Sequence, residues 1–215
     1  MNESSGSRVG SPLTPVDIRP LDLADDNTLA AAYRIECAAT QRVRPGWVPL
    51  GEDARILGWR ADTEWTKHLI GAWDCAQLLG FAACMTADDT PDTTWIDVSE
   101  DPQHWGRGLG SALARTAEDA SPASTTRFVA SAYGLTPDVM DPLIRRFAQP
   151  LGYAVATTET VVELELHSTS LPVPLVADGY EVSTYVNGVP EQFREQLGQI
   201  KGLVAKKAPN GPRLG

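Results

Sequence analysis

Three glycines at alternate positions, Gly106, Gly108 and Gly110, lie in the segment of this sequence whose chemistry is easiest to interpret. A strand-like run ends before them at Pro102, and an amphipathic stretch begins among them at Leu109. Glycines permit a tight turn and let a ligand come close to the backbone amides. The first turn of a helix adds unpaired N–H groups and the positive end of the helix dipole. The segment therefore predicts an anion site suited to a pyrophosphate.

Three other interpretations of this loop can be compared with it: a Rossmann loop, a P-loop and a purely structural turn. A dinucleotide-binding Rossmann loop normally follows the first strand, with an acidic residue about 20 positions later. Here the loop lies mid-chain, and the corresponding region holds Thr126, Arg127 and Phe128. A P-loop requires GK followed by Ser or Thr, which this segment lacks. A purely structural glycine turn stays open as an alternative.

The elements that must position the loop are those of an α+β domain with a mixed central sheet flanked by helices. Alternation and helical periodicity predict the order β–α–α–β–β–β–α–β–α–β. Asp25 or Asp26 is expected to cap the first helix, which runs to about Val43. Strands are expected at residues 16–21, 68–74, 76–86, 93–100, 127–134 and 153–166, and further helices at residues 52–67, 109–120 and 141–149.

The chain divides by composition into four parts. Residues 1–14 are rich in Ser and Gly and are expected to be a disordered leader, residues 15–167 form the main domain, and residues 168–178 form a Pro-containing linker. Residues 179–215 are predicted to add a strand at 180–186 and an amphipathic helix at 190–207.

This tail resembles the beginning of the chain itself. Ile18 and Val182 are 164 positions apart, and so are Pro45 and Pro209. The tail is therefore interpreted as the start of an incomplete second repeat, with chance agreement among common residue types as the alternative. On the repeat interpretation, the second copy stops where its core would begin.

Composition excludes several classes of function. The net charge of −10 argues against nonspecific binding to nucleic acid or to anionic lipid. The sequence has no apolar run approaching the roughly 20 residues that span a bilayer, and the leader does not resemble a signal peptide. The three cysteines form no CxxC pair and the three histidines show no metal-binding spacing. We therefore expect a cytoplasmic protein without a metal site.

The glycine segment resembles the GNAT family of N-acetyltransferases. The family motif is a strand ending in V-x-P, then [QR]-x-x-G-x-[GA] leading into a helix. Pro102 matches the proline, and residues 106–111 match the loop and the first helical turn. Leu151-Gly152-Tyr153 stands where the family has Leu-Gly-Phe, and the resemblance extends from Val16 to Leu166. It implies a GNAT-like acyl-CoA N-acyltransferase fold with acetyl-CoA as co-substrate, here followed by the strand–helix extension.

The resemblance also implies site residues. The amides of residues 105–110 should cradle the pyrophosphate, and the backbone of residues 98–100 should pair with the pantetheine where two strands splay apart. The coenzyme-binding residues are then Val98, Ser99, Glu100, Trp105, Gly106, Arg107, Gly108, Leu109, Gly110 and Ser111.

For catalysis, Asp97 and Glu100 are the candidate bases because they lie beside the expected thioester, followed by Asp92. Each of these carboxylates has an alternative role as a solvated group at the end of a strand. Tyr133 is a candidate general acid, with core packing as its alternative.

Two departures from the family pattern bear on activity. Trp105 stands where the family usually has Arg or Gln, and Ala148 takes the position often held by the general-acid tyrosine. The first hypothesis is acetyl transfer to an amine of a small molecule or a peptide. The second is a catalytically degenerate acetyl-CoA-binding domain, half of a truncated tandem GNAT protein, and the third is a scaffold that binds nothing. A homodimer is left open, and the tryptophans at positions 47, 59 and 65 either line the acceptor pocket or belong to the core.

Overall fold

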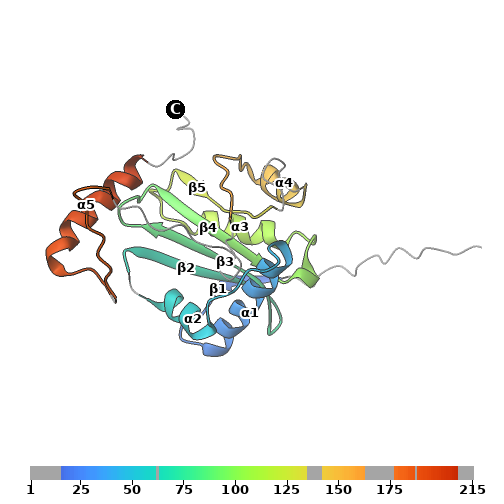
Figure 1. The fold of residues 1–215 in the computed structure, drawn as a ribbon. Helices are drawn as coiled ribbons and strands as arrows, with labels where there is room; N and C mark the ends of the chain where they lie inside the picture. The colour runs from blue at the N-terminus through green and yellow to red at the C-terminus, as the bar shows by residue number, and fades with distance from the viewer. Residues whose placement is uncertain (1–15, 62, 135–141, 163–176, 187, 208–215) are drawn as a thin grey trace, which may run out of the picture. The chain divides into compact units, whose positions relative to one another are not determined.

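The computed structural model describes residues 16–61, 63–134, 142–162, 177–186 and 188–207 (Figure 1). Its contacts divide the chain into two units, Met1–Tyr153 and Ala154–Gly215. The first unit contains a five-stranded sheet, and the described part of the second contains one helix. The predicted leader, most of the predicted linker and the last eight residues lie outside the described residues.

The sheet of the first unit is mixed, with its strands in the order β1-β2-β3-β4-β5. The first four strands pair antiparallel, and β5 is parallel to β4. A parallel pair needs a crossover, which α3 (Leu109–Asp119) provides. The mixed sheet with flanking helices confirms the predicted fold class. The strands are β1 (Asp17–Pro20), β2 (Trp65–Asp74), β3 (Gln77–Ala87), β4 (Thr93–Glu100) and β5 (Arg127–Val129).

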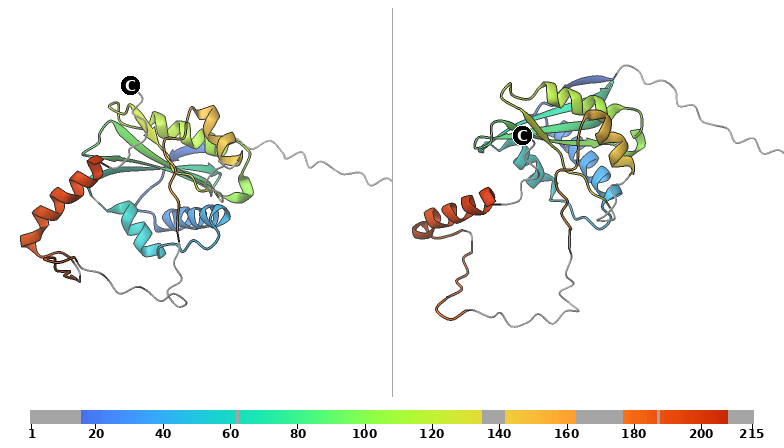
Figure 2. Two further views of the ribbon diagram at one scale, coloured as in Figure 1. Left: turned by 45° about the horizontal axis from the view of Figure 1, so that its top comes forward. Right: turned by 90° about the horizontal axis from the view of Figure 1, so that it is seen from above.

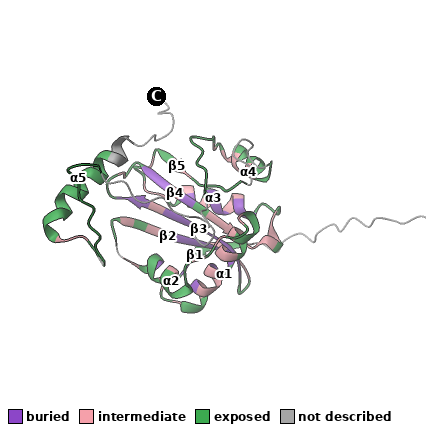
Figure 3. Cartoon of the chain, viewed as in Figure 1, coloured by how far each residue is buried: buried purple, intermediate pink, exposed green. Residues whose placement is uncertain are grey.

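Helices cover both faces of this sheet, as Figure 2 shows. On one face lie α1 (Asp26–Val43) and α2 (Glu52–Arg60), and on the other lies α3. Side chains alternate between the faces of a strand, so the core has two parts. Figure 3 shows that the buried residues concentrate in the central strands and in the helix surfaces facing them. The α1 side includes Leu29, Ile35, Trp59, Leu69 and Phe81, and the α3 side includes Ile70, Leu79, Ile96, Leu109 and Leu113.

Removing the Leu113 side chain should test how strongly α3 is held. Leu113 is 0% exposed, so Leu113→Ala leaves a cavity against the sheet and should lower the free energy of unfolding by about 2–5 kcal/mol. Leu57 on α2 is 68% exposed, and Leu57→Ala should change it by less than about 1 kcal/mol. Urea denaturation of both variants measures the difference. Equal losses would show that α3 does not pack as described.

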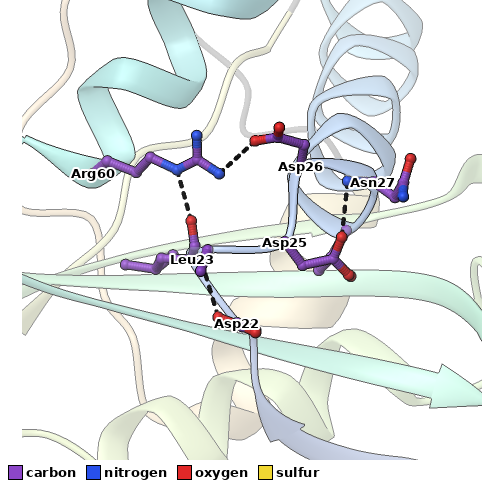
Figure 4. Close-up of polar contacts among 8 residues, drawn as sticks. Asp22, Leu23, Asp25, Asp26, Asn27 and Arg60 are labelled. Carbon is purple, nitrogen blue, oxygen red and sulfur yellow. Dashed lines mark hydrogen bonds and ion pairs between the residues drawn. The ribbon is translucent and has the colours of Figure 1, made fainter.

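The start of α1 is fixed by the aspartates that the sequence singles out. Asp25 is the cap residue, and its carboxylate accepts the backbone N–H of Asn27 at 3.0 Å (Figure 4). Arg60, the last residue of α2, donates to the Leu23 carbonyl at 2.6 Å and to Asp26 at 2.7 Å. These contacts join the end of α2 to the beginning of α1, so the two helices cover the sheet as one layer.

The structure corrects several predicted boundaries. The predicted helix at 52–67 ends at Arg60, because Ala61 has an extended backbone and the aromatic and β-branched run from Trp65 begins β2. The strand predicted at 127–134 stops at Val129. Residues 153–162 of the last predicted strand contain no strand, and residues 163–166 lie outside the described part. The helix predicted at 141–149 is α4 (Pro142–Ala148), with residue 141 not described.

The second unit has the predicted helix but not the predicted strand. The helix is α5 (Glu191–Lys207), whereas the described residues between 180 and 186 have no strand. A strand exists only through ladder hydrogen bonds to a neighbour, and the described part of this unit contains no other strand to pair with it. High β-propensity in residues 180–186 is therefore not sufficient to form one.

The apolar side of α5 should drive association. Phe193, Leu197, Ile200 and Leu203 recur at helical spacing and are all exposed, and such a stripe favours contact with another surface. We expect Leu197→Glu combined with Ile200→Glu to make the chain more monomeric in multi-angle light scattering. A matched variant, Gln196→Glu with Gln199→Glu, should leave the mass unchanged. Identical masses for all three proteins at every concentration would contradict this.

Candidate active site

The loop after β4 has a backbone that depends on its glycines. The strand ends at Glu100, Asp101 caps a short 3-10 helix at Pro102–His104, and the Asp101 carboxylate accepts the Gln103 N–H at 2.9 Å. Gly106 and Gly108 then take positive φ angles of 78° and 85°. A Cβ atom at either position would meet nothing within 4 Å, so the conformation and not the space requires glycine.

This loop delivers the chain directly into the N-terminus of α3. Gly108 is the cap residue and provides no side chain to satisfy the first amides of the helix. The first backbone bond of the helix runs from the Ala112 N–H to the Gly108 carbonyl at 3.1 Å. The amides before Ala112 therefore depend on other acceptors, and they carry the positive end of the helix dipole. This arrangement fits an anionic ligand.

Beside this loop the sheet opens. The ladder between β4 and β5 contains only three residue pairs, from Thr93 with Arg127 to Trp95 with Val129. Beyond Trp95, the residues of β4 through Glu100 have no partner on that edge among the described residues, although β3 pairs with them on the other edge. The free edge thus includes the backbone of Val98, Ser99 and Glu100, which the family resemblance predicts to pair with pantetheine.

The two candidate bases lie on opposite faces of β4. Ile96 and Val98 belong to the core under α3, so by alternation Asp97 faces α1 and α2 while Glu100 faces α3. The Glu100 carboxylate indeed accepts the N–H of Gly110, in the first turn of α3, at 3.1 Å. The structure therefore does not bring Asp97 and Glu100 together, and they cannot share one catalytic role.

Asp97 lies near an ion pair between the two helices. Arg55 of α2 donates from Nε to the Glu36 carboxylate of α1 at 2.8 Å, makes a second short contact with it, and stacks over Trp59. Asp97 as a residue is exposed, yet protein atoms crowd around its carboxyl group and partly bury it. This burial raises the pKa of Asp97, while the positive charge of Arg55 opposes the rise and the negative charge of Glu36 adds to it.

Glu100 is a partly buried carboxylate with an incomplete set of partners. Burial raises the pKa of Glu100 to about 7, although the Gly110 N–H and Arg107 oppose the rise. Its Oε1 atom is buried and has no hydrogen-bond partner in the part of the chain that the structure describes. The Trp105 indole N–H donates to the backbone carbonyl of Glu100 at 2.7 Å, so this residue closes the loop through both its backbone and its side chain.

The remaining predicted residues take different positions. Tyr133 is 44% exposed under the Arg44 guanidinium, 5.0 Å from the ring centroid, so the core-packing alternative is wrong for it. Trp59 is buried against Phe81, which places it in the core. Arg107 is exposed, and a terminal nitrogen of its guanidinium lies 3.5 Å from Nδ1 of His104. The Leu109 side chain packs into the core, so only its backbone can contact a ligand. Ser111 follows in the first turn of α3 and is partly buried.

The motif positions also need one correction. In [QR]-x-x-G-x-[GA] the first residue stands three positions before the first glycine, and here that residue is Gln103. Trp105 therefore occupies an unrestricted position and is not a departure. The departure lies in V-x-P, where Glu100 takes the place of the valine.

Glu36 and Arg55 were missed by sequence reasoning. They lie 19 positions apart on two separate helices, so no local spacing connects them. The face of Glu100, in contrast, can be predicted from the sequence. Glu100 lies an even number of residues from the apolar residues Ile96 and Val98, so its side chain points to the same face of the strand.

Comparisons with known proteins support the family and the fold. The model of the acetyltransferase (GNAT) family matches residues 30–153. A tandem GNAT protein from the clavulanic acid biosynthesis pathway, solved without AcCoA, is 22% identical with a TM-score of 0.55, over 64% of this chain and 43% of that chain. The putative acetyltransferase yncA from Salmonella typhimurium, solved with its cofactor acetyl-CoA, is 21% identical with a TM-score of 0.53, over 67% and 82%.

A putative acetyltransferase from Agrobacterium tumefaciens is 15% identical with a TM-score of 0.50, over 69% of this chain and 99% of that chain. No curated protein matches the sequence. At these identities the solved structures support the fold alone, and the chain spans less than half the length of the tandem protein.

The family match covers more than half of the chain, and the protein therefore belongs to the GNAT family of acetyltransferases.

Proposed function

We propose that the first unit binds acetyl-CoA at the end of β4 and transfers its acetyl group to an amine of a small molecule or a peptide. The observation that carries the proposal is the glycine loop with two left-handed residues, Gly106 and Gly108, at the N-terminus of α3. The loop lies beside the unpaired edge of β4, so a phosphate site and an extended site for a flexible arm adjoin. The residues present thus fit the coenzyme.

Each part of the coenzyme has a set of backbone groups suited to it. The amides of residues 106–110 are placed to bind the pyrophosphate, with Arg107 adding positive charge. The N–H and C=O groups of Val98, Ser99 and Glu100 on the free edge of β4 are placed to pair with the pantetheine amides. When bound, the thioester supplies an activated acetyl group.

On this proposal, Asp97 accepts the proton that the amine must lose. It lies on the β4 face covered by α1 and α2, where the acceptor would enter. A carboxylate within reach of the ammonium, directly or through one water, accelerates such a reaction by roughly 10²–10⁴-fold. The ammonium gives one proton to Asp97, the nitrogen forms the new C–N bond at the thioester carbonyl, and the C–S bond breaks. The second proton lost by the nitrogen passes to the sulfur, which leaves as the thiol.

A catalytically degenerate coenzyme-binding domain is the alternative, and two observations favour it. Ala148 at the end of α4 supplies no acid where the family often has tyrosine, and Tyr133 instead lies exposed beside Arg44. In addition, the described part of the sheet ends at a β5 of only three residues. Both features concern the catalytic half of the site and leave the glycine loop intact.

Two measurements separate these functions. Titration calorimetry with acetyl-CoA tests binding, and its failure would leave the scaffold hypothesis. Release of free thiol during incubation with a panel of amines, including polyamines, amino sugars and peptide N-termini, tests transfer. Binding without thiol release on any amine would favour the degenerate domain over the enzyme.

The partners and location are part of the same proposal. The net charge of −10 favours a cationic acceptor over nucleic acid. Within the described ranges, no helix combines the length and apolar character that crossing a membrane requires. In that same part of the chain no group of three or more His, Cys, Asp or Glu side chains could hold a metal ion. We propose a cytoplasmic enzyme whose chemistry rests on backbone groups and carboxylates.

We also propose that α5 begins a second GNAT-like repeat. The offset of 164 residues seen in the sequence carries α5 onto residues 27–43, which lie within α1 and end where it ends. Phe193 then corresponds to the buried Leu29. The likeness to a tandem GNAT protein is in line with this assignment. We further propose that the main domain spans residues 15–167 and that the linker spans residues 168–178.

A further inference from the structure

The carboxylate of Glu100 already binds a backbone amide that the pyrophosphate of the proposed coenzyme would need. Its Oε2 atom accepts the Gly110 N–H at 3.1 Å, and Gly110 lies in the first turn of α3. A Cβ built on Gly110 would lie 3.1 Å from that oxygen and 3.2 Å from the Phe147 ring. One of the donors facing the pyrophosphate site is therefore already used by a negative group of the chain itself.

The backbone of Glu100 is held from two sides, which fixes the point from which its side chain reaches the Gly110 amide. Gly80 of β3 pairs with Glu100, and a Cβ on Gly80 would lie 2.9 Å from the Ser99 carbonyl and 3.2 Å from Leu113. On the other side, the Trp105 indole binds the Glu100 carbonyl. A pyrophosphate that binds the loop must therefore share its surroundings with this carboxyl group.

The charges facing Glu100 do not offset that conflict. Arg107 of the loop is attractive but exposed, and Asp101, next to Glu100 in the chain, is repulsive. The first turn of α3 contributes the Gly110 amide and no charged side chain, and α4 contributes the Phe147 ring beside Gly110. Among the described residues, the Oε1 atom has no hydrogen-bond partner. An ionised Glu100 beside a pyrophosphate would be a partly buried negative charge next to a second one, with too few donors for both.

We propose that Glu100 couples coenzyme binding to proton uptake: its carboxylate holds the Gly110 amide in the free protein and takes up a proton when a pyrophosphate claims that amide. The inference rests on the proposed function of the loop. The neutral acid no longer repels the phosphates, and its O–H becomes a donor to them. Glu100 is thus a determinant of coenzyme affinity and not a catalytic base.

The expected pH dependence has a definite sign. Burial sets the pKa of Glu100 to about 7 in the free protein, so the group is largely neutral at pH 6 and largely ionised at pH 8. Because only the protonated form accommodates the pyrophosphate, affinity should fall about tenfold between these two pH values. The 3′-phosphate of the coenzyme also titrates near pH 6, but it does so equally for every variant.

Titration calorimetry of the full chain with acetyl-CoA tests this, using Glu100→Gln and Glu100→Val with Glu64→Gln as the control for lost charge at an exposed site. At pH 8, Glu100→Gln should bind about tenfold more tightly than the natural protein, and at pH 6 about equally. Glu64→Gln should behave like the natural protein. In buffers of different ionisation enthalpy at pH 8, the natural protein should take up nearly one proton more than Glu100→Gln.

A readout without coenzyme separates this inference from the proposed function. The amide resonance of Gly110 should titrate with a midpoint near 7 in the free protein and should not titrate in Glu100→Gln. If no variant binds acetyl-CoA, the proposed function fails, whatever the resonance shows. If the natural protein binds but shows the pH dependence of Glu100→Gln, or releases a proton, the coupling is overturned. Thermal unfolding confirms that each variant is folded.

Discussion

Gly108→Val should abolish measurable binding of acetyl-CoA, with a loss of affinity of at least about 100-fold. The φ angle of Gly108 is 85°, where a β-branched residue costs on the order of 1–3 kcal/mol, so the loop should leave its present conformation. The two methyl groups would also stand in the open space next to the first amides of α3. Titration calorimetry on the folded variant measures the effect.

A matched control is available in another left-handed glycine. Gly46, in the connection between α1 and α2, has a φ of 88° and equally open surroundings. Gly46→Val should therefore suffer comparable backbone strain while leaving coenzyme affinity within about threefold. If both variants lose binding to the same degree, the loss reflects strain in the fold. If Gly108→Val keeps its affinity while folded, the loop is not the pyrophosphate site.

Asp97→Asn should lower turnover by roughly 10²-fold or more while leaving the affinity for acetyl-CoA nearly unchanged. The carboxylate is the group on the acceptor face of β4 that can take a proton, and an amide cannot replace it. Asp88→Asn, in an exposed turn, removes an equal charge and should leave turnover within about twofold. Thiol release with the best amine of the panel measures both.

The pH profile provides a second test of Asp97. Burial raises its pKa above the ordinary value, and a base works only when ionised, so activity should decline as the pH falls through that raised pKa. The Asn variant should lack this acidic limb, and its residual activity should follow the amine alone. An unchanged profile, with unchanged turnover, would show that deprotonation runs through water or another group.

Local patterns in the sequence were enough to predict the strand, glycine loop and helix from Thr93 to Asp119, because caps, turns and helical periodicity act over a few residues. The strands expected at 153–166 and 180–186 depended on pairing partners elsewhere in the chain. Alternation and β-propensity report how a segment would pack, and they do not report whether a neighbour is present. The structure accordingly has no strand in the described residues of either segment.

The candidate site shows the same contrast between features set by local sequence and features set by contacts between distant segments. The open glycine loop could be predicted from composition and order alone, whereas the ion pair of Glu36 with Arg55 arises only when two helices pack side by side. Naming both Asp97 and Glu100 as candidate bases assumed that their side chains lie on the same face of the strand. A pleated strand has two surfaces, and the three-residue separation of these carboxylates places them on different ones.

That two-sidedness of β4 has an evolutionary consequence. Odd-numbered residues from Trp95 to Ser99 face α1 and α2, and even-numbered residues from Ile96 to Glu100 face α3. On the proposed function, point substitutions on one face of β4 should change the choice of amine without altering coenzyme binding, and substitutions on the other face should do the reverse. A single-residue insertion or deletion within the strand would exchange the two sets at once. Descendants of this gene should diversify freely by substitution along β4, while keeping its length constant.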